Sequence, residues 1–234
     1  MGDAAARVLR TSLREQLAAL RGEPADTLSP ALLDVTVERV ALAGGDVFLV
    51  RPADWEQLRH EEGAAARPVP YWARQWPSGR VLAAALAAAP PPPGARVLEL
   101  GCGLGLPSIV AARAGADVLA TDGSPDAVAF AAHALALNEV DAQVAVVDWA
   151  AEGDALAARG PWDLVLAADV LYTRANVDVA LRLLPRLLAG GGEVRLADPR
   201  RAGARDLLAA ARATFGVRTM HDGEVALHTL RRRG

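Results

Sequence analysis

From residue 71 onward the sequence alternates short β-type runs with helical patterns. The β runs are expected at 96–100, 117–121, 143–147, 162–168 and 193–197. The helices are expected near 78–89, 106–114, 125–138, 151–158, 176–188 and 201–215. Parallel strands need crossover connections, which are usually helices. The alternation therefore predicts an α/β fold whose mostly parallel sheet is covered on both faces.

Both ends of the chain differ from this pattern. Residues 4–21 carry leucines at helical spacing, which predicts an amphipathic surface helix, and the apolar runs 32–42 and 47–50 flank a turn. We expect residues 1–69 to form an accessory helix and β-hairpin layer, and residues 70–234 to form the main domain. The runs 216–220 and 225–230 meet at a tight turn and predict an antiparallel strand at the C-terminal end of the sheet.

Composition narrows the class of protein. With 52% hydrophobic and 23% charged residues the chain is globular, and a net charge of −3 disfavours a nucleic-acid partner. One cysteine cannot form an internal disulfide, the first residues lack a signal-peptide pattern, and no apolar run is long enough to span a bilayer. We expect a cytoplasmic protein without a membrane partner.

The chain contains no lysine, so all 25 of its Lys+Arg residues are arginine. Together with the abundance of alanine, this is typical of a GC-rich genome. Single arginines therefore carry little functional weight by themselves.

The most informative segment is a glycine loop that follows the β run 96–100. Gly101, Gly103 and Gly105 alternate with other residues immediately before a helix. Glycine lets the backbone turn sharply and approach a ligand, and a helix N-terminus offers free N–H groups. The dinucleotide fingerprint G-x-G-x-x-G would need a third glycine where Leu106 or Ser108 stands, so the loop disfavours NAD.

Glu99 and the three glycines resemble the first motif of class I S-adenosylmethionine (SAM)-dependent methyltransferases. The resemblance implies a Rossmann-like seven-stranded methyltransferase sheet with SAM as the cofactor. Glu99 would help to hold the amino-acid end of SAM, and the glycines would let the backbone pass close to it. Asp122, at the end of the next β run, stands where such folds bind ribose hydroxyls.

Asp148 and Trp149 follow the third β run. By the same resemblance Asp148 would contact the adenine amino group and Trp149 would pack on the ring, as an indole face suits a flat purine. The alternative for Trp149 is a core residue at the sheet edge.

Two further motifs resemble the seven-β-strand methyltransferases of family 16, which includes many protein lysine methyltransferases. One is the D-x-x-Y pair Asp169 and Tyr172, and the other is Pro-Tyr-Trp-Ala-Arg-Gln-Trp-Pro-Ser-Gly at 70–79. The second motif, and Asp-Pro-Arg-Arg at 198–201, are most similar to the branch of the electron transfer flavoprotein β-subunit lysine methyltransferases. That branch commonly has another aromatic residue around Arg74 and Gln75 and glycine at Arg200, so its substrate is not carried over.

The family resemblance implies roles at the reacting end. Trp76 would lie by the cofactor and Tyr172 by the acceptor, and Asp169 would attract and orient an ammonium group. Tyr71 and Trp72 are candidates for substrate binding through their ring faces. The alternatives are that Trp72 belongs to the core and that Asp169 caps a helix.

Arg200 is a candidate for gripping an acidic substrate, or it belongs to a solvated loop. The four histidines are scattered and Cys102 has no recognisable base partner, so we predict no metal and no covalent intermediate. The function indicated is methyl transfer from SAM to a nitrogen, with a protein lysine as acceptor. The alternatives are a small-molecule N-, C- or O-methyltransferase, a non-catalytic nucleotide-binding protein, and an oxidoreductase.

Overall fold

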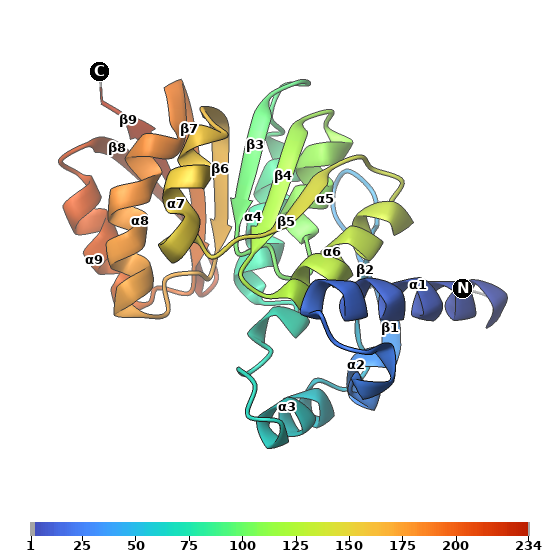
Figure 1. Ribbon diagram of the computed structural model, residues 1–234. Coiled ribbons are helices and arrows are strands. Elements are labelled where there is room, and N and C mark those ends of the chain that lie inside the picture. The colour runs from blue at the N-terminus through green and yellow to red at the C-terminus, as the bar shows by residue number, and fades with distance from the viewer. Residues whose placement is uncertain (1–2, 234) are drawn as a thin grey trace.

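A computed structural model of the chain describes residues 3–233, and a seven-stranded sheet forms its centre (Figure 1). The strand order is β5-β4-β3-β6-β7-β9-β8. The strands are β3 (Arg96–Leu100), β4 (Asp117–Asp122), β5 (Gln143–Val146), β6 (Trp162–Ala168), β7 (Leu188–Asp198), β8 (Phe215–Asp222) and β9 (Val225–Arg232).

Strands β3 to β7 pair in parallel, whereas β9 is antiparallel to both of its neighbours, β7 and β8. This arrangement confirms the prediction of a mostly parallel sheet with an antiparallel C-terminal strand. The order reverses between β3 and β6, which is where ligands bind in open α/β sheets.

Helices cover both faces of the sheet, as the strand–helix alternation predicts. They are α4 (Pro77–Ala88), α5 (Leu106–Arg113), α6 (Pro125–Leu137), α7 (Trp149–Ala158), α8 (Arg174–Leu187) and α9 (Ala202–Ala211). Helices α4, α5 and α6 contribute to one large buried apolar cluster, and α7, α8 and α9 contribute to another. The burial of both faces explains why the central strands β3 and β6 are mostly apolar.

The N-terminal layer consists of α1 (Asp3–Arg21), the turns η1 (Ala25–Thr27) and α2 (Pro30–Leu33), the hairpin β1 (Val35–Val40) and β2 (Val47–Pro52), and α3 (Trp55–Ala64). Helix α1 lies across α6 (Figure 1) and buries Leu13 and Leu17 completely. The predicted amphipathic helix and hairpin are both present. Because this layer shares an apolar cluster with α4 and α6, the boundary near residue 70 stays a prediction.

Three elements differ from the prediction. Helix α3 was not predicted, because it buries only Leu58 and Glu62 and so lacks an apolar stripe. Strand β7 begins at Leu188, although its glycine-rich start is typical of a loop. A Cβ at Gly192 would lie 2.8 Å from the carbonyl oxygen of Trp162, so the strands approach closely only because the residue is glycine. Helix α9 ends at Ala211, four residues before the predicted end.

Candidate functional site

A cleft of about 970 Å³ lies at the carboxyl ends of β3, β4, β5 and β6. Its lining comes from the glycine loop, from the segments that follow these strands, and from the turn η2 (Tyr71–Ala73). The N-terminal layer contributes side chains from α1 and α3, among them Arg21 and Glu62. The cleft therefore brings together residues from the whole chain.

The glycine loop has the backbone conformation that its sequence predicts. Gly101, Gly103 and Gly105 have φ angles of 67°, 52° and 79°, in the left-handed region that favours glycine. A Cβ at Gly101 would lie 2.8 Å from the Cγ1 atom of Val170, so no larger residue fits there without rearrangement. Gly101 and Gly103 line the cleft, whereas Gly105 is the N-cap of α5 and packs against Ala131.

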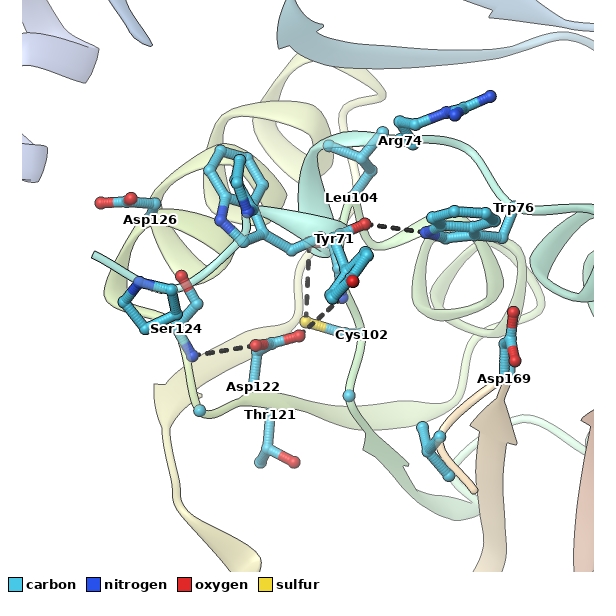
Figure 2. Close-up of a pocket in the computed structure, with 18 of the residues that line it drawn as sticks. Tyr71, Arg74, Trp76, Cys102, Leu104, Thr121, Asp122, Ser124, Asp126 and Asp169 are labelled. Carbon is cyan, nitrogen blue, oxygen red and sulfur yellow. Dashed lines mark hydrogen bonds between the residues drawn. The ribbon is translucent and has the colours of Figure 1, made fainter. Parts of the chain in front are cut away.

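Asp122 lies at the end of β4 with its carboxylate facing the glycine loop (Figure 2). One carboxylate oxygen accepts a hydrogen bond from the N–H of Gly103 at 3.0 Å, and the other accepts one from Ser124 at 2.9 Å. Burial raises the pKa of Asp122 above its usual range, although these N–H donors favour the charged form. Each oxygen keeps a lone pair for a further donor, such as a ribose hydroxyl.

Glu99 is 1% exposed at the end of β3. Its Oε2 atom accepts a hydrogen bond from the N–H of Ser108 at 3.0 Å and another from the Ser108 hydroxyl. Burial raises the pKa of Glu99 to about 8. The carboxyl group thus reaches the first turn of α5 and also lines the cleft.

Asp148 and Trp149 line the cleft at the end of β5. Asp148 is the N-cap of α7, and its side chain accepts a hydrogen bond from the N–H of Ala150 at 2.9 Å. Trp149 is half-buried and packs against the cluster under α7 and α8. Its position is compatible with both alternatives for this residue: packing on the adenine ring and belonging to the core at the edge of the sheet.

Asp169 follows β6 with a φ of 58°, which is unusual for a residue other than glycine. Its carboxylate is 9% exposed and is paired with Arg201, whose Nε and Nη2 atoms donate to the two carboxylate oxygens at 2.6 and 3.1 Å. The N–H of Arg201 donates to Asp198 at 2.6 Å. The other oxygen of Asp198 is buried without a hydrogen-bond partner, and burial raises the pKa of this carboxyl group. Residues with a strained backbone, such as Asp169, cluster at functional sites.

Aromatic rings gather near Asp169. The ring of Tyr71 lies 6.4 Å from the rings of both Trp76 and Tyr172, and the indole N–H of Trp76 donates to the Tyr71 carbonyl at 2.7 Å (Figure 2). Tyr71 and Tyr172 are 53% and 58% exposed. Trp72 also lines the cleft, but its ring packs on the buried Phe130 at 4.9 Å, as its core alternative requires.

Arg200 lies apart from these residues. Its φ is 63° and its Nε atom donates to the carbonyl oxygen of Glu224, whereas the next residue, Arg201, lines the cleft. Sequence reasoning did not assign Arg201 to the Asp169 carboxylate. The signal available was its place in the segment after the fifth parallel strand, where sheet topology brings side chains toward the site.

The hydrogen-bond acceptors of the cleft fit SAM better than the pyrophosphate of a dinucleotide. The carboxyl groups of Glu99, Asp122 and Asp148 line the cleft and can accept hydrogen bonds from ribose hydroxyls, an adenine amino group and the ammonium of an amino-acid end, whereas a pyrophosphate offers them no hydrogen-bond donor. Within residues 3–233, no group of three or more His, Cys, Asp or Glu side chains could hold a metal ion. Cys102 is buried, and burial raises the pKa of its thiol well above the usual range, as for a packing residue.

The model of one protein family, described as lysine methyltransferase, matches residues 75–207, which is more than half of the chain. The chain belongs to the lysine methyltransferase family. The match begins at Gln75 and includes the glycine loop, Asp169 and Arg201. It leaves out the N-terminal layer.

The individual proteins that the chain resembles are methyltransferases of more than one kind. The chain is 37% identical over 136 residues to the electron transfer flavoprotein β-subunit lysine methyltransferase of Xenopus laevis, covering 57% of this chain and 54% of that protein. It is also 37% identical over 133 residues to a ubiquinone biosynthesis O-methyltransferase of Xanthomonas oryzae, covering 56% of this chain and 54% of that protein. The chain thus spans about half the length of these curated relatives.

Solved structures agree on the fold. The 16S rRNA N2 G1207 methyltransferase of T. thermophilus, solved with AdoMet and guanosine, superposes with a TM-score of 0.63 at 19% identity, over 85% of this chain and 51% of that one. Among the described helices of this lysine methyltransferase family member, none is long and apolar enough to cross a membrane.

Proposed function

We propose that the protein transfers a methyl group from SAM to a nitrogen, with the ε-amine of a protein lysine as the acceptor. One observation carries the proposal. In this member of the lysine methyltransferase family, one end of the cleft is formed by the carboxylate of Asp169 and the aromatic rings of Tyr71 and Tyr172. Asp169 and Tyr172 are the proposed catalytic residues there, with Tyr71 and Trp72 contributing to acceptor binding. Tyr71 and Tyr172 are both more than half exposed, so this end of the cleft is accessible to a macromolecule.

SAM would supply an activated methyl group on a sulfonium centre, and the chain would bind it through the residues at the other end of the cleft. The proposed cofactor ligands are Trp76, Glu99, Gly101, Gly103, Gly105, Asp122, Asp148 and Trp149. Gly105 acts by shaping the loop, since it caps α5 instead of lining the cleft. The carboxyl groups would accept hydrogen bonds from the ribose, the adenine and the amino-acid end.

The acceptor amine must lose a proton before it can attack. An ε-ammonium has an ordinary pKa of about 10.4, so freeing its lone pair near pH 7 costs on the order of 4–5 kcal/mol. Desolvation between Tyr71, Trp76 and Tyr172 would lower the pKa of the ammonium. Asp169 would orient the nitrogen, and its pairing with Arg201 would keep it from over-stabilising the charged form. The proton would leave to water at the exposed mouth.

Asp169→Asn tests this assignment, because asparagine tolerates a positive φ and keeps the shape of the side chain. We expect turnover to fall at least about tenfold while calorimetric affinity for SAM changes less than about twofold. Asp178→Asn, an exposed carboxylate on α8, is the control. Unchanged turnover in Asp169→Asn would remove this residue from the site, and a preference for NAD over SAM would overturn the methyltransferase proposal itself.

A small-molecule acceptor is the second candidate, favoured by the similarity to an O-methyltransferase. Fractionating labelled products into protein and metabolites separates the two.

We also propose that residues 1–69 form an accessory layer to the domain at 70–234. The cytoplasm is the proposed location, since the single cysteine, Cys102, is a free thiol.

A further inference from the structure

Arg74 stacks on two tryptophans that belong to different parts of the molecule. Its guanidinium carbon lies 5.0 Å from the ring centroid of Trp55, in α3, and 5.1 Å from that of Trp76, at the start of α4. Among the side chains that the structure describes, no carboxylate pairs with Arg74. Its planar guanidinium is thus held chiefly by the two indoles, a contact that arginine makes better than lysine.

Both indole N–H groups donate hydrogen bonds to neighbouring carbonyls of the segment that joins the two tryptophans. The Trp55 N–H donates to the carbonyl oxygen of Pro70 at 3.0 Å, and the Trp76 N–H donates to that of Tyr71 at 2.7 Å. The same segment crosses the glycine loop closely, because a Cβ at Gly103 would lie 3.4 Å from the carbonyl oxygen of Trp72. These contacts connect α3 to the wall of the cleft.

From these contacts we infer that Arg74 is a positioning residue that couples helix α3 to Trp76. The N-terminal layer thereby sets the place of the Trp76 ring in the cleft. This inference rests on the proposed function insofar as Trp76 meets SAM. Figure 2 shows Arg74 above the glycine loop and beside Trp76, on the side away from Asp122.

Arg59 provides a matched control. It also stacks on Trp55, at 5.6 Å, but its only ionic partner among the described residues is Glu56 on the same helix. Arg59→Gln removes a cation from the same indole without touching Trp76. Arg74→Gln removes the bridge, and Arg74→Lys keeps the charge with a smaller stacking surface.

The experiment measures two quantities on the full chain: acrylamide quenching of tryptophan fluorescence, and the Kd for SAM by calorimetry. We expect Arg74→Gln to increase quenching and to weaken SAM binding roughly three- to tenfold. Arg59→Gln should leave the Kd unchanged and should increase quenching less than Arg74→Gln does, because it uncovers only Trp55. Arg74→Lys should lie between the wild type and Arg74→Gln. Melting curves identify any variant that fails to fold. If Arg74→Gln does not fold, the comparison of Arg74→Lys with the wild type tests the inference instead.

The same comparison in a Trp76→Leu background isolates the coupling. There, Arg74→Gln should have no further effect on the Kd for SAM, and its effect on quenching should fall to the part that comes from Trp55. An equal effect in both backgrounds, or equal effects of Arg74→Gln and Arg59→Gln, would overturn the inference. If the wild-type protein bound no SAM, the proposed function would fail, while the quenching comparison would still decide whether Arg74 positions Trp76.

Discussion

Arg201 donates two hydrogen bonds to the carboxylate of Asp169, at 2.6 and 3.1 Å. The two residues follow adjacent parallel strands, β6 and β7, and Asp198 holds the backbone of Arg201 in place. An uncompensated carboxylate would stabilise an acceptor ammonium and so raise the cost of deprotonation. In the proposed mechanism, Arg201 would reduce that penalty while leaving Asp169 able to accept a hydrogen bond.

Arg201→Gln should therefore lower kcat for the methyl-accepting protein by roughly tenfold near pH 7 without raising KM. The bare carboxylate would bind the ammonium at least as well but would hold it in the unreactive form. Steady-state kinetics at saturating SAM measure both constants. A rise in kcat would contradict this role, because it would identify Arg201 as a competitor of the substrate cation.

Asp122→Ala should weaken SAM binding by about 10- to 100-fold, since hydrogen bonds to a charged group contribute about 1.5–3 kcal/mol. The substitution also removes the acceptor for the N–H groups of Gly103 and Ser124. Asp117→Ala, at the exposed start of the same strand, is the control and should leave the Kd unchanged. Calorimetry with SAM gives both values, and equal affinities would place the ribose elsewhere.

The buried Glu99 makes stability depend on pH. Burial raises the pKa of Glu99 to about 8, from a usual value of 4.5, so between these values the folded chain keeps a proton that the unfolded chain releases. The contribution of the protonated Glu99 to the free energy of unfolding is fully present below pH 4.5 and is lost as the pH rises toward 8. Relative to Glu99→Gln, the wild type should lose at least about 1 kcal/mol of unfolding free energy between pH 5 and pH 8. Urea unfolding at the two pH values measures this, and a constant difference would show that the carboxyl group ionises normally.

Arg21 joins the N-terminal layer to the main domain. Its guanidinium pairs with Asp126 on α6 and with Glu62 on α3, and all three side chains are at most 10% exposed. Arg21→Met should destabilise the protein by about 3 kcal/mol, because it leaves the buried carboxylate of Asp126 without its cationic partner. Arg39→Met, from an exposed pair with Asp46, should cost less than about 0.5 kcal/mol. Thermal or urea unfolding measures the loss of stability in each variant. Equal losses in the two variants would show that the buried ion pair does not stabilise the fold.

The sheet could be predicted from the sequence because its strands are buried on both faces. Strands β3 and β6 begin and end at the predicted residues, and the positive φ angles of Gly101 and Gly103 follow from the glycine loop. These features depend on neighbours in the chain, so a local pattern is enough to find them.

The contacts that complete the site depend on residues distant in sequence. Asp169 and Arg201 pair across 32 residues, and Arg74 meets Trp55 in a helix without an apolar stripe. The place of Arg201 after a parallel strand puts it near the site, but nothing in the spacing of Arg74 or Arg201 identifies the side chains that they contact. In a chain whose 25 Lys+Arg residues are all arginine, only the folded arrangement separates the functional ones.

Transfer of labelled methyl from SAM into the protein fraction of a cell lysate tests the central claim most directly. The absence of lysine from the chain makes this assay clean, because the enzyme has no lysine side chain of its own to methylate. We predict label on lysine residues of a lysate protein, reduced at least about tenfold with Asp169→Asn. Label found only in the small-molecule fraction, or none at all with SAM bound, would contradict protein lysine methylation.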